Sequence, residues 1–490
     1  MARLDGSNTR TDVGGGVSVR APGYRGEITR VPPPAVGGTR APAGTATKRP
    51  LSDALAAAEV QTTHTFTIDL RSVPGPRPAG TRVPGGADAM VVNLPQAGSG
   101  QGQAALLVDP SGVVTWHYPQ SDPAAAGRVQ FVVPVETASP VVETPAGQRG
   151  LIGAVVHQLL SIVVFPIVEE IVGAAAERVA AYWERKNRPY RVRTFTPDDY
   201  QVLGTGTVDT VDWSHLSGGP ALLLVHGTFS SSRGGFGGLP AEVLGRLNNT
   251  YGTRLFAFDH PTLSVTPQQN VTELLARTPA GLRLKVDVLC HSRGGLVARA
   301  LDAAGAPAYD VRRIVFVATP NKGTVLADPK RLGALVNRYT TMLNLIPDGP
   351  WSVATDVLQG VLTAVKVLGQ GALGGLPGLQ VMDPSNAWLT ALGAGAPHRP
   401  DYYGIAADFE PSGGLKLLAR AVDLVADDVF SQVLNDLVVP TEGVAHPRDA
   451  DGFPLPADRT LRLDQTANVW HSSYFSNASV TKALLNWLLG

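Results

Sequence analysis

Residues Val286–Leu301, with the sequence VDVLCHSRGGLVARAL, decide the fold. An apolar run reaches a small polar turn at Ser292 and then continues with helical spacing, which predicts a strand that turns sharply into a helix. Such a turn holds a serine hydroxyl above the edge of a sheet, provided that the residues two positions away are small. Gly294 meets this requirement and Gly295 helps, whereas Cys290 stands where a glycine is usual. We therefore predict a nucleophile elbow with Ser292 as the nucleophile. Cys290 is the rival, but its place on the strand favours a small buried side chain.

Apolar runs of the buried-strand type alternate with helical segments on both sides of this elbow. They are ALLLVHG (221–227), RLFAFDHP (254–261), RRIVFVATP (312–320) and DYYGIAADF (401–409). This alternation predicts an α/β fold with a mostly parallel sheet flanked by helices. A largely helical insertion at about 322–400 is expected to form a cap. Its apolar residues are expected either to line an acyl pocket or to pack the cap on the core: Leu332, Leu335, Leu343, Leu345, Val357, Val361 and Val365.

The strand ALLLVHG ends in His226-Gly227 and is followed by a polar loop. Backbone N–H groups in such a loop can bind a developing oxyanion, and the helix that begins after the elbow offers a second donor. We assign the two donors to Thr228 and Arg293, with Phe229 as the alternative to Thr228. His226 and Gly227 are expected to shape the turn rather than to act as a base.

A catalytic serine needs a base and an orienting acid, which follow it in the order acid, then histidine. Of the later histidines, His398 and His446 lie in irregular segments, whereas His471 precedes the terminal helical segment, where the base is expected. Asp436 lies beside a short apolar strand and is the candidate acid. Asp408 also follows a strand and remains its rival.

Together these motifs resemble the lipase-like α/β-hydrolases. The motifs are CHSRGG (290–295), VHGTFS (225–230), ATPNKGT (318–324), LPGLQVM (376–382), NDLVVP (435–440) and the late histidine. The resemblance covers about Arg191 to Gly490 and is closest to uncharacterised bacterial members with an N-terminal β-rich extension. It implies an α/β-hydrolase fold with a helical cap, a serine esterase or lipase activity, and a carboxylic-ester or lipid-ester substrate. The aspartate of the NDLVVP segment is the family's triad acid, which favours Asp436 over Asp408. Asp259 and His260, in a stretch that also looks typical of the family, are expected to border the site.

No cofactor is expected. The histidines lack metal-ligand spacing and a single cysteine cannot build a thiolate site. His291, inside the elbow, is expected to be held by packing. Asp259 and His260 are expected to be hydrogen-bond partners of loops rather than catalysts.

The chain before the catalytic part divides by composition into three segments. Residues 1–60 are rich in Gly, Pro, Thr and Arg without periodicity, which predicts a flexible or disordered segment. Residues 61–145 contain short β-rich runs and a DPSG turn at 109–112, which predict a small β-rich domain. Residues 146–190 are expected to form a long linking amphipathic helix, and residues 191–490 the α/β-hydrolase domain.

The predicted helix, at about 151–185, carries polar residues about seven to eight positions apart, which would place them on one solvent-exposed face. Residues Leu151–Val168 approach the length of a membrane span, but polar residues interrupt them. A helix docked between domains is the preferred interpretation, ahead of a membrane-surface helix and a transmembrane span. Two functions of other classes remain open: a catalytically silent interaction module, and a scaffold that contacts a membrane surface or a protein through this helix.

The charge balance and the cysteine content indicate which partners and which cellular compartment are expected. Lys+Arg and Asp+Glu both number 41 in 490 residues, so no overall field favours nucleic acid. One cysteine excludes an intrachain disulfide and favours a reducing compartment. The first residues show no apolar secretory run. A cytoplasmic location is expected, with peripheral membrane association as the alternative.

Overall fold

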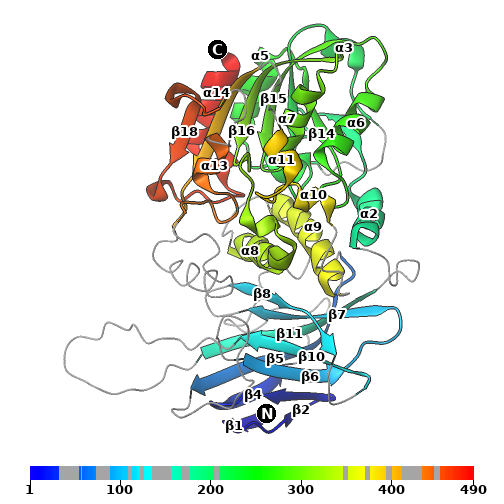
Figure 1. Ribbon diagram of the computed structural model, residues 1–490, viewed down its shortest axis with the longest axis vertical. Coiled ribbons are helices and arrows are strands. Elements are labelled where there is room, and N and C mark those ends of the chain that lie inside the picture. The colour runs from blue at the N-terminus through cyan, green and yellow to red at the C-terminus, as the bar shows by residue number, and fades with distance from the viewer. Residues whose placement is uncertain are drawn as a thin grey trace, which may run out of the picture. The chain divides into compact units, whose positions relative to one another are not determined.

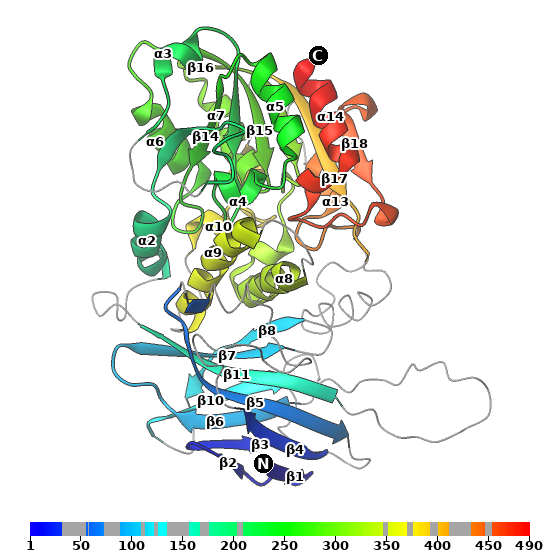
Figure 2. The same cartoon turned by 180° about the vertical axis from the view of Figure 1, so that it is seen from behind.

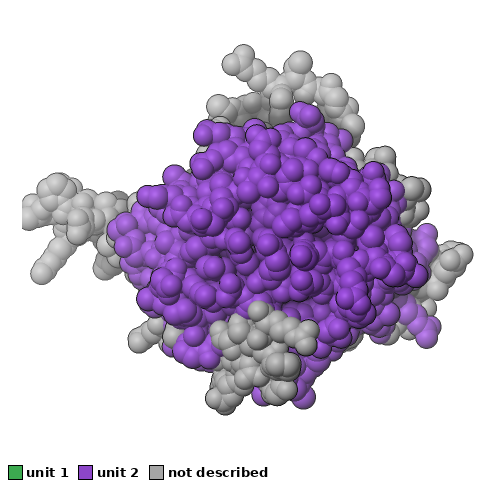
Figure 3. Space-filling model, turned by 90° about the horizontal axis from the view of Figure 1, so that it is seen from above, with its two compact units in different colours: residues 1–172, 365–372 green, residues 173–364, 373–490 purple. Residues whose placement is uncertain are grey.

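The computed structural model describes residues 1–31, 55–56, 58–72, 89–108, 113–121, 126–134, 156–166, 176–202, 209–345, 351–369, 376–392, 400–410, 433–445 and 453–490. The chain forms two compact units. The smaller contains residues 1–172 and 365–372, and the larger contains residues 173–364 and 373–490. Figure 3 shows one face of the larger unit in purple.

The larger unit is built on a seven-stranded sheet. In spatial order its strands are β12 (Arg191–Thr194), β14 (Leu255–Asp259), β13 (Ala221–Val225), β15 (Leu284–His291), β16 (Tyr309–Val317), β17 (Asp401–Ala407) and β18 (Thr460–Leu463). Only β12 runs antiparallel to its neighbour, and every other pair is parallel. The strands at the centre are buried on both faces, as the uninterrupted apolar runs predict.

Helices cover both faces of this sheet (Figures 1 and 2). Helices α5 (Ala241–Thr250) and α14 (Ala478–Leu489) contribute apolar residues to one core, together with alternate residues of the strands. Helices α6 (Pro267–Arg277) and α7 (Gly294–Ala304) contact each other, and α7 contacts β13, β15 and β16 on the other face. The predicted fold class, an α/β-hydrolase fold, is therefore confirmed.

Helices of the predicted insertion lie between β16 and β17 in the chain. They are α8 (Leu332–Leu345), α9 (Trp351–Gly369), α10 (Pro377–Gln380) and α11 (Ala387–Ala391). The other α-helices among the described residues of the larger unit are α2 (Ala176–Asn187), α3 (Trp213–Ser217), α4 (Ser232–Phe236) and α13 (Thr441–Ala445).

The described strands of the smaller unit form two antiparallel sheets. One has the order β1 (Ala2–Asp5), β4 (Tyr24–Val31), β5 (Gln61–Ser72), β11 (Val156–Pro166), β7 (Gln101–Val108) and β8 (Val114–His117). The other has the order β2 (Thr11–Gly14), β3 (Val17–Arg20), β6 (Ala89–Pro95), β10 (Arg128–Pro134) and β9 (Gln120–Ser121). Apolar residues of both sheets form one core. The predicted DPSG turn lies outside the described residues, between the paired strands β7 and β8.

The prediction that residues 1–60 lack regular structure is wrong for residues 2–31, which form β1 to β4. Three consecutive glycines of this Gly-rich segment, Gly14, Gly15 and Gly16, lie at the turn between β2 and β3 and all have positive φ. Such a turn favours glycine because side chains clash there. Val17 and Val19 alternate with polar residues and point into the core.

The prediction of one long helix at 146–190 is also wrong. Residues 156–166 are strand β11, paired with both β5 and β7, and of the described residues in this range only 176–187 are helical. The strand is rich in β-branched residues, and two of the polar residues taken for a solvent-exposed helical face, Gln158 and Ser161, are buried within the sheet. Ser161, for example, contacts Thr65 across the strands, with 3.4 Å between their hydroxyl oxygens. The described residues of 151–185 therefore do not form the single amphipathic helix that was proposed to contact a membrane surface. No described helix is both long and apolar enough for a membrane span.

Candidate active site

Ser292 occupies the turn between β15 and α7. Its φ is 53°, a left-handed backbone conformation that costs free energy for a residue other than glycine. Its N–H donates to the carbonyl of Val317 at 2.9 Å, which ties the turn to the neighbouring strand. Strand β15 ends one residue before Ser292, and α7 begins two residues after it. This is the strained strand-to-helix turn that the sequence predicts.

The small residues of the elbow are explained by close packing. A Cβ on Gly294 would lie 2.2 Å from the carbonyl oxygen of Val225, and one on Gly295 would lie 2.2 Å from the Thr319 hydroxyl. Both distances are far below van der Waals contact, so neither position has room for a side chain. On the strand side, Cys290 is fully buried and its thiol donates to the carbonyl of Val315 at 3.2 Å. Burial raises the pKa of this thiol well above its ordinary value, which keeps it protonated.

We expect Gly294→Ala to damage the elbow. The added methyl meets backbone atoms, so α7 or β13 must shift, and we expect a destabilisation of about 2–3 kcal/mol with loss of most activity. The matched control is Gly245→Ala in α5, where a Cβ meets nothing within 4 Å. That change should stabilise by about 0.5–1 kcal/mol. Apparent melting temperatures measure both effects, and a Gly294→Ala variant as stable as the wild type contradicts the packing argument.

Cys290→Gly should leave ester hydrolysis within about threefold of the wild-type rate, because the thiol has no role at the turn. Cys290→Leu should lose activity, since the site is fully buried and a larger side chain must displace the elbow. Steady-state kinetics of the two variants test this. Loss of all turnover in Cys290→Gly would make the thiol, rather than the Ser292 hydroxyl, the candidate nucleophile.

His471 joins Ser292 to Asp436. Its Nε2 lies 2.9 Å from the Ser292 hydroxyl oxygen and its Nδ1 lies 2.9 Å from Oδ2 of Asp436. All three side chains are buried, with 2%, 0% and 1% of Ser292, His471 and Asp436 exposed. The structure thus brings together the three residues predicted as nucleophile, base and acid. His398 and His446, the histidines considered beside His471, lie outside the described residues.

Asp436 is held as a carboxylate. Burial alone would raise its pKa, but the charge and hydrogen bond of His471, with the N–H groups of Val439 and Val438, lower that pKa below its ordinary value. The two N–H groups donate to Oδ1 at 2.7 and 3.0 Å, and the Tyr474 hydroxyl donates to Oδ2 at 2.9 Å. Because a carboxylate only accepts, Nδ1 of His471 carries the proton and Nε2 is free to accept one from the serine.

Asp408 does not contact His471. Its Oδ2 accepts a hydrogen bond from the side chain of Gln465 at 3.1 Å, and its N–H donates to the carbonyl of Leu463. The structure therefore pairs His471 with Asp436 rather than with Asp408.

The loop after β13 runs directly beside the elbow. A Cβ on Gly227 would lie 2.6 Å from Cβ of Ser292, so only glycine fits there. The N–H of Phe229, the alternative oxyanion donor, is already bonded to the Thr262 hydroxyl at 3.2 Å. The N–H groups of Thr228 and Arg293 have no acceptor among the described residues. These two groups remain available to bind a charged oxygen near Ser292.

His226 and His260 lie behind this loop. Nδ1 of His226 donates to the carbonyl of Gly227 at 3.0 Å, and its Nε2 accepts from the N–H of His260 at 3.2 Å. The two rings stack with 4.1 Å between centroids. Burial, reinforced by the neighbouring His226, lowers the pKa of His260 well below its ordinary value. Asp259 accepts from Arg191 and from the N–H of Ser232. None of these contacts reaches the triad: the Arg191–Asp259 contact joins strands β12 and β14, and the others support loops.

Two residues that support the triad were not predicted in that role. His291 was expected to be held by packing, but its Nε2 also donates to the backbone carbonyl of His471 at 2.9 Å. Burial, and next the neighbouring His471, lower the pKa of His291 to about 3, so this ring is neutral. Tyr474, beyond its bond to Asp436, accepts from the N–H of Ala407 at 2.9 Å. The position of Tyr474 in the same loop as His471 was the only local signal for its role.

Helices of the insertion contact the site through residues that the sequence did not single out. Tyr339 of α8 packs edge-on against His471, with 5.9 Å between ring centroids, and against Phe229, with 5.0 Å. Helix α9 approaches the same loop, because a Cβ on Gly360 would lie 2.3 Å from the carbonyl oxygen of Phe229. Six of the seven apolar insertion residues proposed to line an acyl pocket are buried, and the structure does not describe the side chain of the seventh, Leu345.

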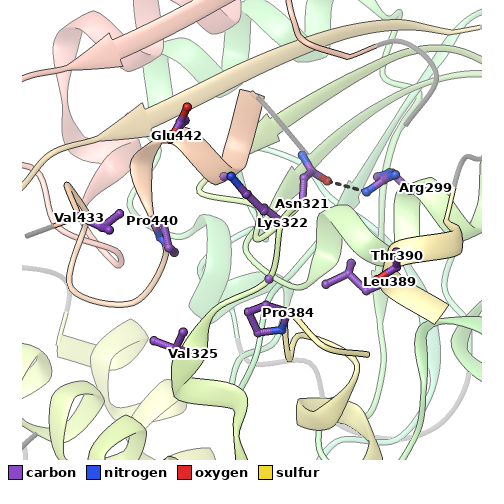
Figure 4. A pocket seen from close by; sticks show the side chains of 12 residues that line it. Arg299, Asn321, Lys322, Val325, Pro384, Leu389, Thr390, Val433, Pro440 and Glu442 are labelled. Carbon is purple, nitrogen blue, oxygen red and sulfur yellow. Dashed lines mark hydrogen bonds between the residues drawn. The ribbon is translucent and has the colours of Figure 1, made fainter. Parts of the chain in front are cut away.

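A hollow of about 250 Å³ lies elsewhere in the larger unit and is lined in part by Arg299, Asn321, Lys322 and Glu442 (Figure 4). The Arg299 guanidinium donates a hydrogen bond to the side-chain oxygen of Asn321 at 3.3 Å, so it already has a partner within the protein. No residue predicted for the triad or the oxyanion donors lines this hollow. The part of the chain that the structure describes contains no cluster of His, Cys, Asp and Glu that could hold a metal ion.

Solved structures give weak similarities. Lipase BlEst2 of Bacillus licheniformis in its mature form is 17% identical, with 55% of this chain and 92% of that chain covered and a TM-score of 0.28. Lipase 1 from Pelosinus fermentans is 12% identical, with 55% and 97% covered and a TM-score of 0.36. The enol-lactonase from Burkholderia xenovorans LB400 is 15% identical, with 61% and 96% covered and a TM-score of 0.32. Similarities at this level assign no activity to this chain.

No curated protein matches the chain. One family model, described as a domain of unknown function (DUF7379), matches residues 187–489. This match covers β12 to α14, which contain the elbow, the triad residues and the helical insertion. Because it spans more than half of the chain, the protein belongs to the DUF7379 family.

Proposed function

We propose that this protein is a serine hydrolase that cleaves carboxylic esters through an acyl-enzyme intermediate. The observation that carries the proposal is the buried hydrogen-bonded chain from Asp436 through His471 to Ser292. Serine, histidine and aspartate in this arrangement activate the serine hydroxyl on several unrelated folds.

The first half of the reaction forms the acyl-enzyme. His471 accepts the Ser292 proton at Nε2 as the serine oxygen bonds to the ester carbonyl carbon, and the carbonyl electrons move to oxygen. The imidazolium that forms is stabilised by the adjacent Asp436 carboxylate. His471 then gives the proton to the leaving alkoxide as the carbon–oxygen bond of the ester breaks.

The negative oxygen of the tetrahedral intermediate needs preorganised donors. The N–H groups of Thr228 and Arg293 suit this role, because they flank Ser292 and have no acceptor among the described residues. Water then attacks the acyl-enzyme, with His471 again as base, and releases the acid and the free serine.

The surroundings of Thr228 favour an uncharged, apolar acyl group. Its hydroxyl lies 3.9 Å from the sulfur of Met382, and the Tyr339 ring packs against both Phe229, the next residue of the loop, and His471. A charged acyl group would lose its hydration against these side chains without gaining a partner.

Hydrolysis of p-nitrophenyl esters of increasing chain length by the full-length protein tests the proposal. We expect turnover above the rate in buffer and a preference that changes with chain length. Absence of turnover with every ester would favour a catalytically silent protein. Transfer of the acyl group to an added alcohol or amine, in preference to water, would replace hydrolysis by acyl transfer.

A further inference from the structure

Helix α2 carries a buried carboxylate that the proposed chemistry does not use. Glu184, near its C-terminal end, is 1% exposed, whereas Glu177 on the same helix is exposed. Among the described residues, no Lys, Arg or His nitrogen forms an ion pair with Glu184. Burying a carboxylate is costly unless hydrogen bonds replace its hydration, so its partners matter.

The partners of Glu184 are the N–H groups of three consecutive residues. Oε1 accepts from the N–H groups of Thr262 and Leu263 at 2.6 and 2.8 Å. Oε2 accepts from the N–H and the hydroxyl of Ser264 at 2.9 and 2.6 Å. Successive backbone N–H groups that converge on one anion form a strong, rigid contact. Glu184 therefore fixes the conformation of residues 262–264.

The fixed segment contacts both loops that would bind the oxyanion. The Thr262 hydroxyl accepts from the N–H of Phe229 at 3.2 Å, which orients the peptide that follows Thr228. Oε1 of Glu184 lies 3.5 Å from the same hydroxyl, so the hydroxyl can donate to the carboxylate while it accepts from Phe229. One residue beyond the segment, the carbonyl of Val265 accepts from the buried guanidinium of Arg293 at 2.6 Å.

We propose that Glu184 is a positioning residue for the oxyanion pocket. Through Thr262 it holds the Thr228–Phe229 loop so that the Thr228 N–H faces the substrate oxygen, and through residues 262–265 it supports Arg293. This inference rests on the proposed ester hydrolysis. It also places part of the functional machinery before residue 187, where the family match begins.

Glu184→Gln tests this role with little change in shape. In either orientation the new amide NH₂ meets an N–H that previously donated to an oxygen, so residues 262–264 must shift. In other enzymes, removal of one oxyanion donor lowers kcat by about 100- to 1000-fold. Glu184→Gln only displaces the Thr228 N–H, so we expect kcat to fall by about 10- to 100-fold, with KM changed less than about threefold. The matched control, Glu177→Gln on the exposed face of α2, should retain wild-type kinetics.

Two measurements separate positioning from a merely structural effect. Rates are expressed per active site, counted by covalent labelling with a fluorophosphonate, so that unfolded protein does not lower kcat. A trifluoromethyl ketone, which becomes a tetrahedral oxyanion when serine adds to it, should lose at least as much affinity as kcat loses, because both depend on the oxyanion donors.

Thr262→Val provides a second variant if Glu184→Gln folds poorly. It removes the hydroxyl that binds Phe229 but keeps the N–H that binds Glu184, and it should also lower kcat rather than raise KM. Wild-type kcat per labelled site in both variants overturns the inference while leaving the proposed function intact. A wild-type protein without ester turnover or labelling overturns both.

Discussion

Replacing Ser292 with alanine is expected to lower kcat for p-nitrophenyl esters by at least about 10⁴-fold, because no other group on the turn can form the acyl-enzyme. Cys290 cannot substitute, since its thiol is buried on the strand and bonded to Val315. Steady-state and single-turnover kinetics of the purified variant measure the loss. Turnover close to that of the wild type would exclude Ser292 as the nucleophile.

The fold of the Ser292→Ala variant should be unchanged. Alanine tolerates a φ of 53° about as well as serine does, and the change removes only the hydrogen bonds of the Ser292 hydroxyl, to His471 and Tyr339. Each such bond contributes about 1 kcal/mol, so the melting temperature should move by only a few degrees. A large drop in melting temperature would mean that lost activity reports unfolding rather than chemistry.

Asp436→Asn should lower kcat by about 10³- to 10⁴-fold while the triad keeps its geometry. The asparagine NH₂ would donate to Nδ1 of His471, so the ring would carry its proton on Nε2 and could not accept the proton of Ser292. Kinetics measured at neutral pH test this, and Asp408→Asn is the matched control, because Asp408 contacts Gln465 instead. Equal losses in the two variants would remove the reason for assigning the acid to Asp436.

The lowered pKa of Asp436 also predicts a pH dependence of stability. A carboxyl whose pKa is lower in the folded state stabilises the fold above its unfolded pKa of about 3.9, and this contribution is lost as the pH falls through the folded value. Melting temperature should therefore fall more steeply with acid in the wild type than in Asp436→Asn, at pH values below about 4. The same slope in both proteins would mean that the pKa of Asp436 is not lowered on folding.

The parts of the site that lie at strand ends could be predicted from the sequence. Ser292 and Thr228 each follow an apolar run, and parallel strands bring their carboxyl ends to one edge of a sheet. Asp436 precedes the apolar run LVVP and was preferred because the NDLVVP segment resembles that of a known family. His471 was found from its position before the last helix and from the order of triad residues in this fold. In these cases a short local pattern was enough to predict the strand or helix, and the order of strands in the sheet then predicted that the side chains lie close together.

The supporting residues could not be predicted in the same way. Tyr339 and Glu184 act through contacts with residues far away in the chain, and neither lies in a distinctive local motif. Residues 156–166 were assigned to a helix because polar residues interrupt the apolar run at helical spacing. Pairing with β5 and β7, which no local pattern reveals, makes them a strand instead.

Covalent labelling of the full-length protein with a fluorophosphonate, followed by mass spectrometry of its peptides, tests the central claim most directly. The reagent reacts with a serine only when a base activates it and donors stabilise its oxyanion. We expect one adduct, on Ser292, that is absent from Ser292→Ala and forms much more slowly in Asp436→Asn. Absence of an adduct from the wild-type protein, or an adduct on a residue other than Ser292, would contradict the assignment of this site as a serine hydrolase.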